Sequence, residues 1–226
     1  MSAYTDYFQA VKGCSEGAQA ALMQVWRALD FTRPQECRDI LLEMLPPIVE
    51  RYGNAAATAA AEMYEAVSLA ETNRRRRALM AEAATDGIVK SVRYAAGWLY
   101  ENESDKVLSV IVKALDYYVK QPARETVEQT VFRDRKEGAR YARVPQGPTT
   151  CEFCVMLASK GFVYKTKSSA GEGYHTDCDC MPVVSFESEP KVEGYDPDYW
   201  YDLYKQMKDK DKWNKAHQAK KDRARM

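Results

Sequence analysis

The chain has 226 residues, 46% of them hydrophobic, which is enough to bury a genuine core of one medium domain with a small appendage. Lysine plus arginine number 33, as do aspartate plus glutamate, so no overall charge draws the protein to nucleic acid or to an anionic membrane. No window holds the roughly 18 apolar residues that span a bilayer, and no secretory signal is recognisable at the N-terminus. We therefore expect a soluble protein made in a reducing compartment.

About the first 140 residues show the spacing of helices that each bury one face. Apolar residues recur at steps of three and four in three segments, namely residues 4–29, 86–100 and 105–119. The alanine-rich stretch 54–70 has high helix propensity and little bulk, so we expect it to pack closely against a neighbour. These segments together predict an N-terminal helical domain.

Prolines mark the expected limits of two further helices. One begins near Pro34, because proline is tolerated in the first turn, and Pro46-Pro47 is expected to interrupt it. Its inward side chains are expected to be Ile40, Leu41 and Leu45. After Pro122 another helix is expected over residues 125–141. Its inward side chains are expected to be Val127, Val131 and Phe132.

The amino-acid composition changes after residues 143–148, which contain two prolines and a glycine. Glycine, serine, threonine, tyrosine and valine then predominate, which favours short strands and turns. An acidic linker over residues 187–197 leads into a C-terminal helix and a basic tail. The predicted fold is mainly α, in three parts: a helical domain (1–143), a zinc-stabilised module of short strands and turns (144–186), and the linker, helix and tail (187–226).

Four of the six cysteines and one of the two histidines lie within thirty residues of one another. Cys151 and Cys154 form a CxxC, and some twenty residues further on His175, Cys178 and Cys180 form an HxxCxC. Two such clusters at this spacing converge on one tetrahedral ion in many zinc folds. We therefore predict that these residues bind Zn²⁺. Cys178 and Cys180 would point to opposite sides of an extended strand, so both can reach one ion only if the chain turns there.

Three other interpretations of the cysteines compete with structural zinc. A thioredoxin-like CxxC needs a βαβ context, and a disulfide-stapled loop needs an oxidising compartment. A nucleobase deaminase needs an HxE motif upstream of its CxxC, whereas here the CxxC comes first. A catalytic zinc would keep one position open beside a general base such as Glu152, Asp177 or Asp179, while a cysteine-rich shell is usually closed. Structural zinc is the prediction, and these remain alternatives.

The same region resembles a known family. The run Ala142-Arg143-Val144-Pro145-Gln146-Gly147-Pro148-Thr149-Thr150-Cys151-Glu152-Phe153-Cys154-Val155-Met156-Leu157-Ala158-Ser159-Lys160-Gly161-Phe162-Val163-Tyr164 and the later Tyr174-His175-Thr176-Asp177-Cys178-Asp179-Cys180 carry the resemblance. They resemble the MuF-like minor capsid or head-morphogenesis proteins of tailed phages infecting actinobacteria. The specific match covers roughly residues 140–186, and the helical N-terminus matches more loosely.

That resemblance implies a structural protein of the virion, not an enzyme. It would lie inside the capsid near the portal, contact the portal protein and other capsid proteins, and act in head assembly, DNA packaging or ejection. Some members of the family carry a fused protease or toxin domain, for which this chain has no motif. The alternative is a zinc-dependent nuclease using the same cysteines, but an HNH-type nuclease needs more histidines than His175 and His217.

Two basic segments could contact phage DNA. The tail, residues 205–226, has a clear excess of lysine and arginine over aspartate, so we expect it to supply any DNA affinity. The run of arginines at residues 74–77 is the second choice, since a short charge run is usually a solvated helix face or turn. We expect Cys14 and Cys37 to be small core residues and His217 to be exposed.

Overall fold

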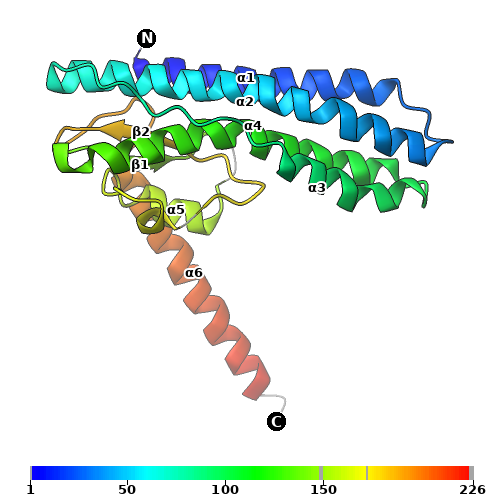
Figure 1. The fold of residues 1–226 in the computed structure, drawn as a ribbon. Coiled ribbons are helices and arrows are strands. Elements are labelled where there is room, and N and C mark those ends of the chain that lie inside the picture. The colour runs from blue at the N-terminus through cyan, green and yellow to red at the C-terminus, as the bar shows by residue number, and fades with distance from the viewer. Residues whose placement is uncertain (1, 148–149, 172, 224–226) are drawn as a thin grey trace.

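A computed structural model describes residues 2–147, 150–171 and 173–223, with side chains described up to residue 210. Four helices build an elongated body, in which α1 (Ala3–Arg27) and α2 (Pro34–Thr72) lie above α3 (Asp86–Ala95) and α4 (Ser104–Asp134) (Figure 1). Strands β1 (Arg140–Val144) and β2 (Met181–Ser185) and the short helix α5 (Glu152–Ala158) lie below one half of the body, and α6 (Pro197–Arg223) projects away from it. The predicted mainly helical fold with a small strand-containing part and a C-terminal helix is confirmed.

Helix α1 is one continuous helix, as its apolar spacing predicts. The Ser2 hydroxyl caps it by accepting a hydrogen bond from the N–H of Thr5 at 3.2 Å. Gly17 does not divide the helix, although glycine lowers helix propensity. A Cβ at Gly17 would come within 2.5 Å of the Tyr52 ring, so the missing side chain allows α1 and α2 to pack closely.

The expectation that Pro46-Pro47 interrupts the second helix is wrong. Helix α2 runs for 39 residues through both prolines, and α4 likewise runs through Pro122, joining two helices that were expected to be separate. An interior proline costs a helix roughly 3 kcal/mol. Packing offsets that cost here, because the neighbouring Leu45 and Val49 are completely buried and Pro122 is buried as well. Helix α4 ends at Asp134. The last expected helix was to run to residue 141, but Arg140 and Tyr141 belong to β1 instead.

Two side chains expected to face inward are partly exposed. Ile40 is 39% exposed and Phe132 is 49% exposed, whereas Leu41 on the same turn of α2 is completely buried. The buried positions of α2 recur four residues apart, at Cys37, Leu41, Leu45 and Val49. Ile40 precedes that stripe by one position and so lies at its edge.

This difference predicts unequal effects of two neighbouring substitutions. Leu41→Ala is expected to lower the free energy of unfolding by about 2–5 kcal/mol, because it leaves a cavity in the core. Ile40→Ala should cost much less, since the side chain already contacts solvent. Chemical denaturation of the two variants measures both values. Equal losses would mean that Ile40 is buried in solution.

The sheet joins the predicted helical domain to the predicted zinc module. β1 (Arg140–Val144) and β2 (Met181–Ser185) are antiparallel, with Ala142 opposite Val183. Both strands are almost wholly buried, and one hydrophobic core extends from helices α1, α2 and α4 through the sheet to α5. A second core fills the other end of the helical body. The proposed boundary between residues 143 and 144 therefore falls inside β1, and the domain limits stay a prediction.

The acidic linker forms a compact turn, in which Val192 pairs with Tyr195 and both side chains are buried. Helix α6 follows, and its first turns pack against α5 (Figure 1). Within the described ranges, no helix is both long enough and apolar enough to cross a membrane.

Candidate metal centre

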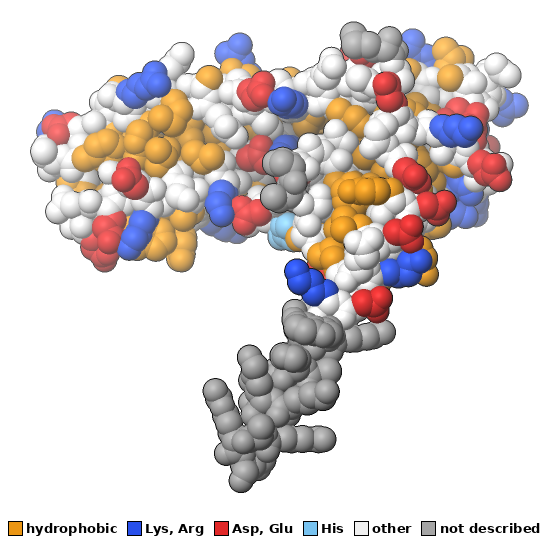
Figure 2. Space-filling model, turned by 180° about the vertical axis from the view of Figure 1, so that it is seen from behind, with side chains coloured by type: hydrophobic (Ala, Val, Ile, Leu, Met, Phe, Trp, Pro, Cys, Tyr) orange, Lys and Arg blue, Asp and Glu red, His pale blue; other side chains and the backbone are white. Residues whose placement is uncertain are grey.

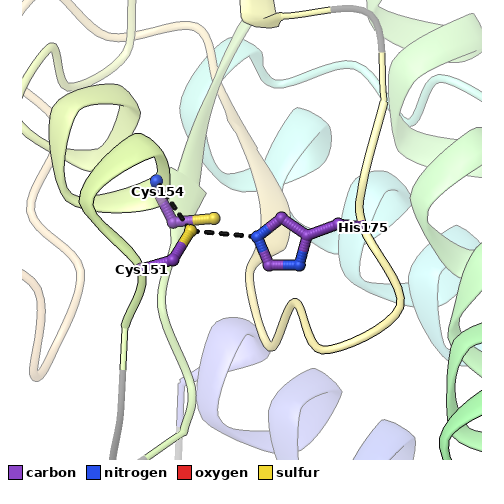
Figure 3. A group of neighbouring side chains, drawn as sticks. All are labelled: Cys151, Cys154 and His175. Carbon is purple, nitrogen blue, oxygen red and sulfur yellow. Dashed lines mark hydrogen bonds between the residues drawn. The ribbon is translucent and has the colours of Figure 1, made fainter.

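Two of the predicted ligands are held by the start of α5 (Glu152–Ala158). Cys151 is the N-terminal cap of this helix, and its sulfur accepts the N–H of Cys154 at 3.4 Å. Cys154 lies in the first helical turn, so both sulfurs face the same space (Figure 3). Cys154 is buried, whereas Cys151 is exposed. The CxxC motif therefore begins helix α5, and the sulfur of Cys151 caps that helix.

The other three predicted ligands approach from the segment that leads into β2. A turn brings the N–H of Cys178 to the carbonyl of His175 at 3.0 Å. His175 Nε2 lies 2.9 Å from Cys151 Sγ, and Cys178 Sγ lies 3.3 Å from Cys154 Sγ (Figure 3 shows the first pair). Cys180 is buried close by. The structure therefore brings together all five residues that the spacing predicts.

The donor atoms form two groups that share one residue. Cys151, Cys154 and His175 lie within 4.8 Å of one another, and so do Cys154, Cys178 and Cys180. Cys178 and Cys180 thus both reach Cys154, because the chain turns before them instead of continuing as a strand. Among the described residues, Cys154 is the one that belongs to both groups.

The arrangement fits a tetrahedral ion. Zinc–sulfur bonds of about 2.3 Å place two thiolates about 3.8 Å apart, so the 3.3 Å between Cys154 Sγ and Cys178 Sγ needs only a small side-chain rotation. The cavity that all five residues line has a volume of about 10 Å³. That space is the size of roughly one water, so it suits an ion. A larger pocket of about 510 Å³ borders the exposed ligands Cys151 and His175. The cluster could thus bind a metal such as zinc.

Two buried arginines, which the sequence analysis did not identify, surround the cluster. Arg124 of α4 donates from Nε to the carbonyl of Cys180 at 3.2 Å and from Nη2 to that of Cys178. Arg143 of β1 donates from Nη2 to Cys178 Sγ at 3.5 Å. The Tyr174 ring lies between the two guanidinium groups, 4.1 Å from Arg124 Cζ and 3.8 Å from Arg143 Cζ. No short motif signals Arg124, because it lies far from the cysteines in sequence.

Hydrogen bonds within the cluster change the acidity of its groups. Burial raises the pKa of the Cys151 thiol, but its hydrogen bonds to His175 and to the N–H of Cys154 outweigh burial and lower it. The contact with Cys151 raises the pKa of His175, against the effect of burial. Contacts with Cys154 and Cys180, helped by Arg124, lower the pKa of Cys178 despite burial. Thiolate and neutral imidazole are the forms that bind metal, so the contacts of Cys151 and Cys178 favour coordination, whereas the raised pKa of His175 opposes it.

The three acidic residues proposed as general bases all pair with lysines. Glu152 pairs with Lys208 of α6, Asp177 Oδ1 lies 3.1 Å from Lys113 Nζ, and Asp179 Oδ1 lies 3.3 Å from Lys120 Nζ. Lys113 and Lys120 belong to α4, so these ion pairs fasten the cysteine segment to the helical body and to α6.

The remaining predicted residues lie away from the cluster. Cys37 is buried and donates to the carbonyl of Asp30 at 3.1 Å, while Cys14 is partly buried. The arginine run at residues 74–77 follows α2 and is mostly exposed, as expected, but it lies largely outside any helix or turn. Arg75 pairs with Glu65 at 2.9 Å and Arg76 with Glu137 at 3.1 Å. His217 and most of the basic tail lie outside the residues whose side chains are described.

Comparison with known proteins identifies the family. A protein-family model described as VG15 protein matches residues 1–207, which cover the helical body, the cysteine cluster and the start of α6. Searches of curated proteins and of solved structures found no match. Because the family model matches most of its length, the chain belongs to the VG15 protein family.

Proposed function

We propose that the chain is a MuF-like minor capsid protein of a tailed phage, in which the cysteine cluster holds a structural Zn²⁺. The observation that carries this proposal is the cysteine–histidine cluster formed by the residues of the MuF-like resemblance. In the proposed role the protein lies inside the head near the portal. There it contacts the portal and other capsid proteins during head assembly, DNA packaging or ejection.

Two features support a structural ion over a catalytic one. The cavity that all five residues line, about 10 Å³, has the size of a single ion or water, and three or four cysteine ligands are typical of structural zinc. The nearest carboxylates, those of Glu152, Asp177 and Asp179, pair with lysines, so none is free to act as a general base. Both features also count against the zinc-dependent nuclease. We therefore propose that the protein is not an enzyme.

The distribution of charge offers no evident DNA-binding surface on the face drawn in Figure 2. On the face seen in Figure 2, basic and acidic side chains are interspersed and form no continuous basic surface. In the described part of the tail, Lys205 pairs with Asp202 at 2.9 Å and Lys208 with Glu152. Any DNA contact is still proposed for the tail, residues 205–226, which has the cationic excess.

Quantitative mass spectrometry of purified phage tests the location. We expect the protein in tail-less heads, in a fixed number of copies relative to the portal protein. Crosslinking of these heads should yield crosslinks between the chain and the portal. Finding the protein in the lysate but not in purified heads would contradict the proposal.

The role of the tail is tested separately. Deleting residues 205–226 is expected to abolish weak, salt-dependent DNA binding, because the deleted segment carries the cationic excess. Gel-shift titration at low and high salt measures the effect. The matched control replaces Arg74 and Arg77 with glutamine and should bind as the full chain does. If instead the control loses binding and the truncated chain keeps it, the arginine run is the DNA contact.

A further inference from the structure

We infer that Cys178, not Cys180, completes the metal centre with Cys151, Cys154 and His175, and that Arg124 and Arg143 are the buried cations that neutralise it. This inference rests on the proposed structural ion and specifies its ligands. It assigns a role to two arginines that no cysteine motif contains.

The backbone places His175 and Cys178 as a pair. The N–H of Cys178 bonds to the carbonyl of His175 at 3.0 Å, so a single turn presents both side chains. Cys151 and Cys154 have the same spacing of three, and the N–H of Cys154 bonds to the sulfur of Cys151. Two turns of equal spacing therefore face each other across the cavity. Such a pair of turns supplies four ligands to one ion.

Cys180 is held differently. It directly precedes β2, whose first residue, Met181, pairs with Val144, so the sheet fixes its backbone. Its carbonyl accepts the Arg124 Nε–H at 3.2 Å. The sulfur that receives an arginine N–H is that of Cys178, from Arg143 Nη2 at 3.5 Å. A hydrogen bond from a cation favours the thiolate, so Arg143 marks Cys178 as the ligand.

The charge of the centre explains why two cations are buried beside it. Arg124 and Arg143 are 0% and 1% exposed, and guanidinium stays protonated in proteins, so they bring two positive charges into the interior. Zn²⁺ with three thiolates and a neutral imidazole carries 2 − 3 = −1. A buried negative charge is costly without a partner of opposite sign, and the two guanidinium groups supply that partner.

The arginines also position the ligand segment. Arg143 Nη1 donates to the carbonyls of Ala170 at 3.0 Å and Gly173 at 2.8 Å, just before His175. Arg124 binds the carbonyls of Cys178 and Cys180, which lie after it. The two guanidinium groups therefore hold both ends of the segment that carries His175 and Cys178. Replacing a residue that holds the metal ligands in place typically lowers metal affinity 10–100-fold.

Cobalt substitution of the full-length protein tests the ligand set, because the sulfur-to-cobalt absorption grows with the number of bound thiolates. We expect the signal of three thiolates in the unaltered chain and in Cys180→Ser. Cys178→Ser should lose one thiolate or the ion itself. Loss of a thiolate in Cys180→Ser, or a four-thiolate signal in the unaltered chain, would overturn the assignment. Failure of the unaltered chain to bind either zinc or cobalt would instead refute the proposed structural ion.

The arginines are tested with charge-removing and charge-keeping variants. Arg124→Gln is expected to weaken zinc binding 10–100-fold in a chelator competition, and Arg124→Lys should recover part of the loss. Arg133→Gln is the matched control, because Arg133 lies on the same helix and pairs with Asp134 instead of the cysteine segment. Circular dichroism checks that each variant remains helical. Equal losses in the glutamine and lysine variants, or no loss in either, would show that the charge of Arg124 does not neutralise the centre.

Discussion

Replacing Cys154 with serine is expected to empty the metal centre and to unfold the segment around it, while the helical body survives. Cys154 belongs to both groups of donor atoms, so its loss breaks both groups. A small structural zinc module can owe about 10 kcal/mol or more to its ion. Helix α5 has only seven residues, so we expect its packing to be too weak to hold it once its first turn loses the ion.

Zinc analysis and limited proteolysis measure this effect. The unaltered protein should carry about one zinc per chain and the variant none. Cleavage of the variant should begin near Gly161 or Gly171, while circular dichroism keeps its helical signal. Cys14→Ser is the matched control, because Cys14 lies on α1 and should leave the zinc content unchanged. A metal-free preparation that resists protease would contradict the prediction, and a disulfide from Cys151 or Cys154 to Cys178 or Cys180 would then replace it.

Removal of the metal is also expected to release α6 from the body. The first turns of α6 pack on α5, and Lys208 pairs with Glu152 in the first turn of α5. Tyr195, which lies just before α6, donates its hydroxyl to the carbonyl of Ala158, the last residue of α5, at 2.6 Å. Because α5 begins at two metal ligands, the ion fixes the helix on which α6 rests.

Hydrogen exchange over residues 197–210 measures this release. Chelation should increase exchange there strongly, while α2 and α4 keep their protection. Lys208→Gln is the control, because it breaks one partly exposed ion pair, of the kind worth at most about 1 kcal/mol, and leaves the metal in place. Unchanged exchange in α6 after complete removal of zinc would show that the helix is held independently of the ion.

The candidate metal site was predictable because its information is local. A CxxC and an HxxC each place two donors within one turn, and that spacing is visible in the sequence without knowledge of the fold. The helices were predictable for a similar reason, since an apolar residue every three or four positions defines a face. Helix limits were less predictable. Leu45 and Val49 pack so well that α2 continues through Pro46-Pro47, which local propensity alone would interrupt.

The sequence by itself determined the residue types that can bind a metal, their pairing into two short clusters, and the helical character of the chain. Only the tertiary structure decided which charged side chains lie beside the metal ligands. Arg124 lies on a long helix and Arg143 on a strand, yet both guanidinium groups reach the same tyrosine ring beside the cysteines. Burial makes this contact significant, because a charge removed from water requires a partner of opposite sign nearby. Packing between elements distant in sequence supplies that partner, and no local pattern records it.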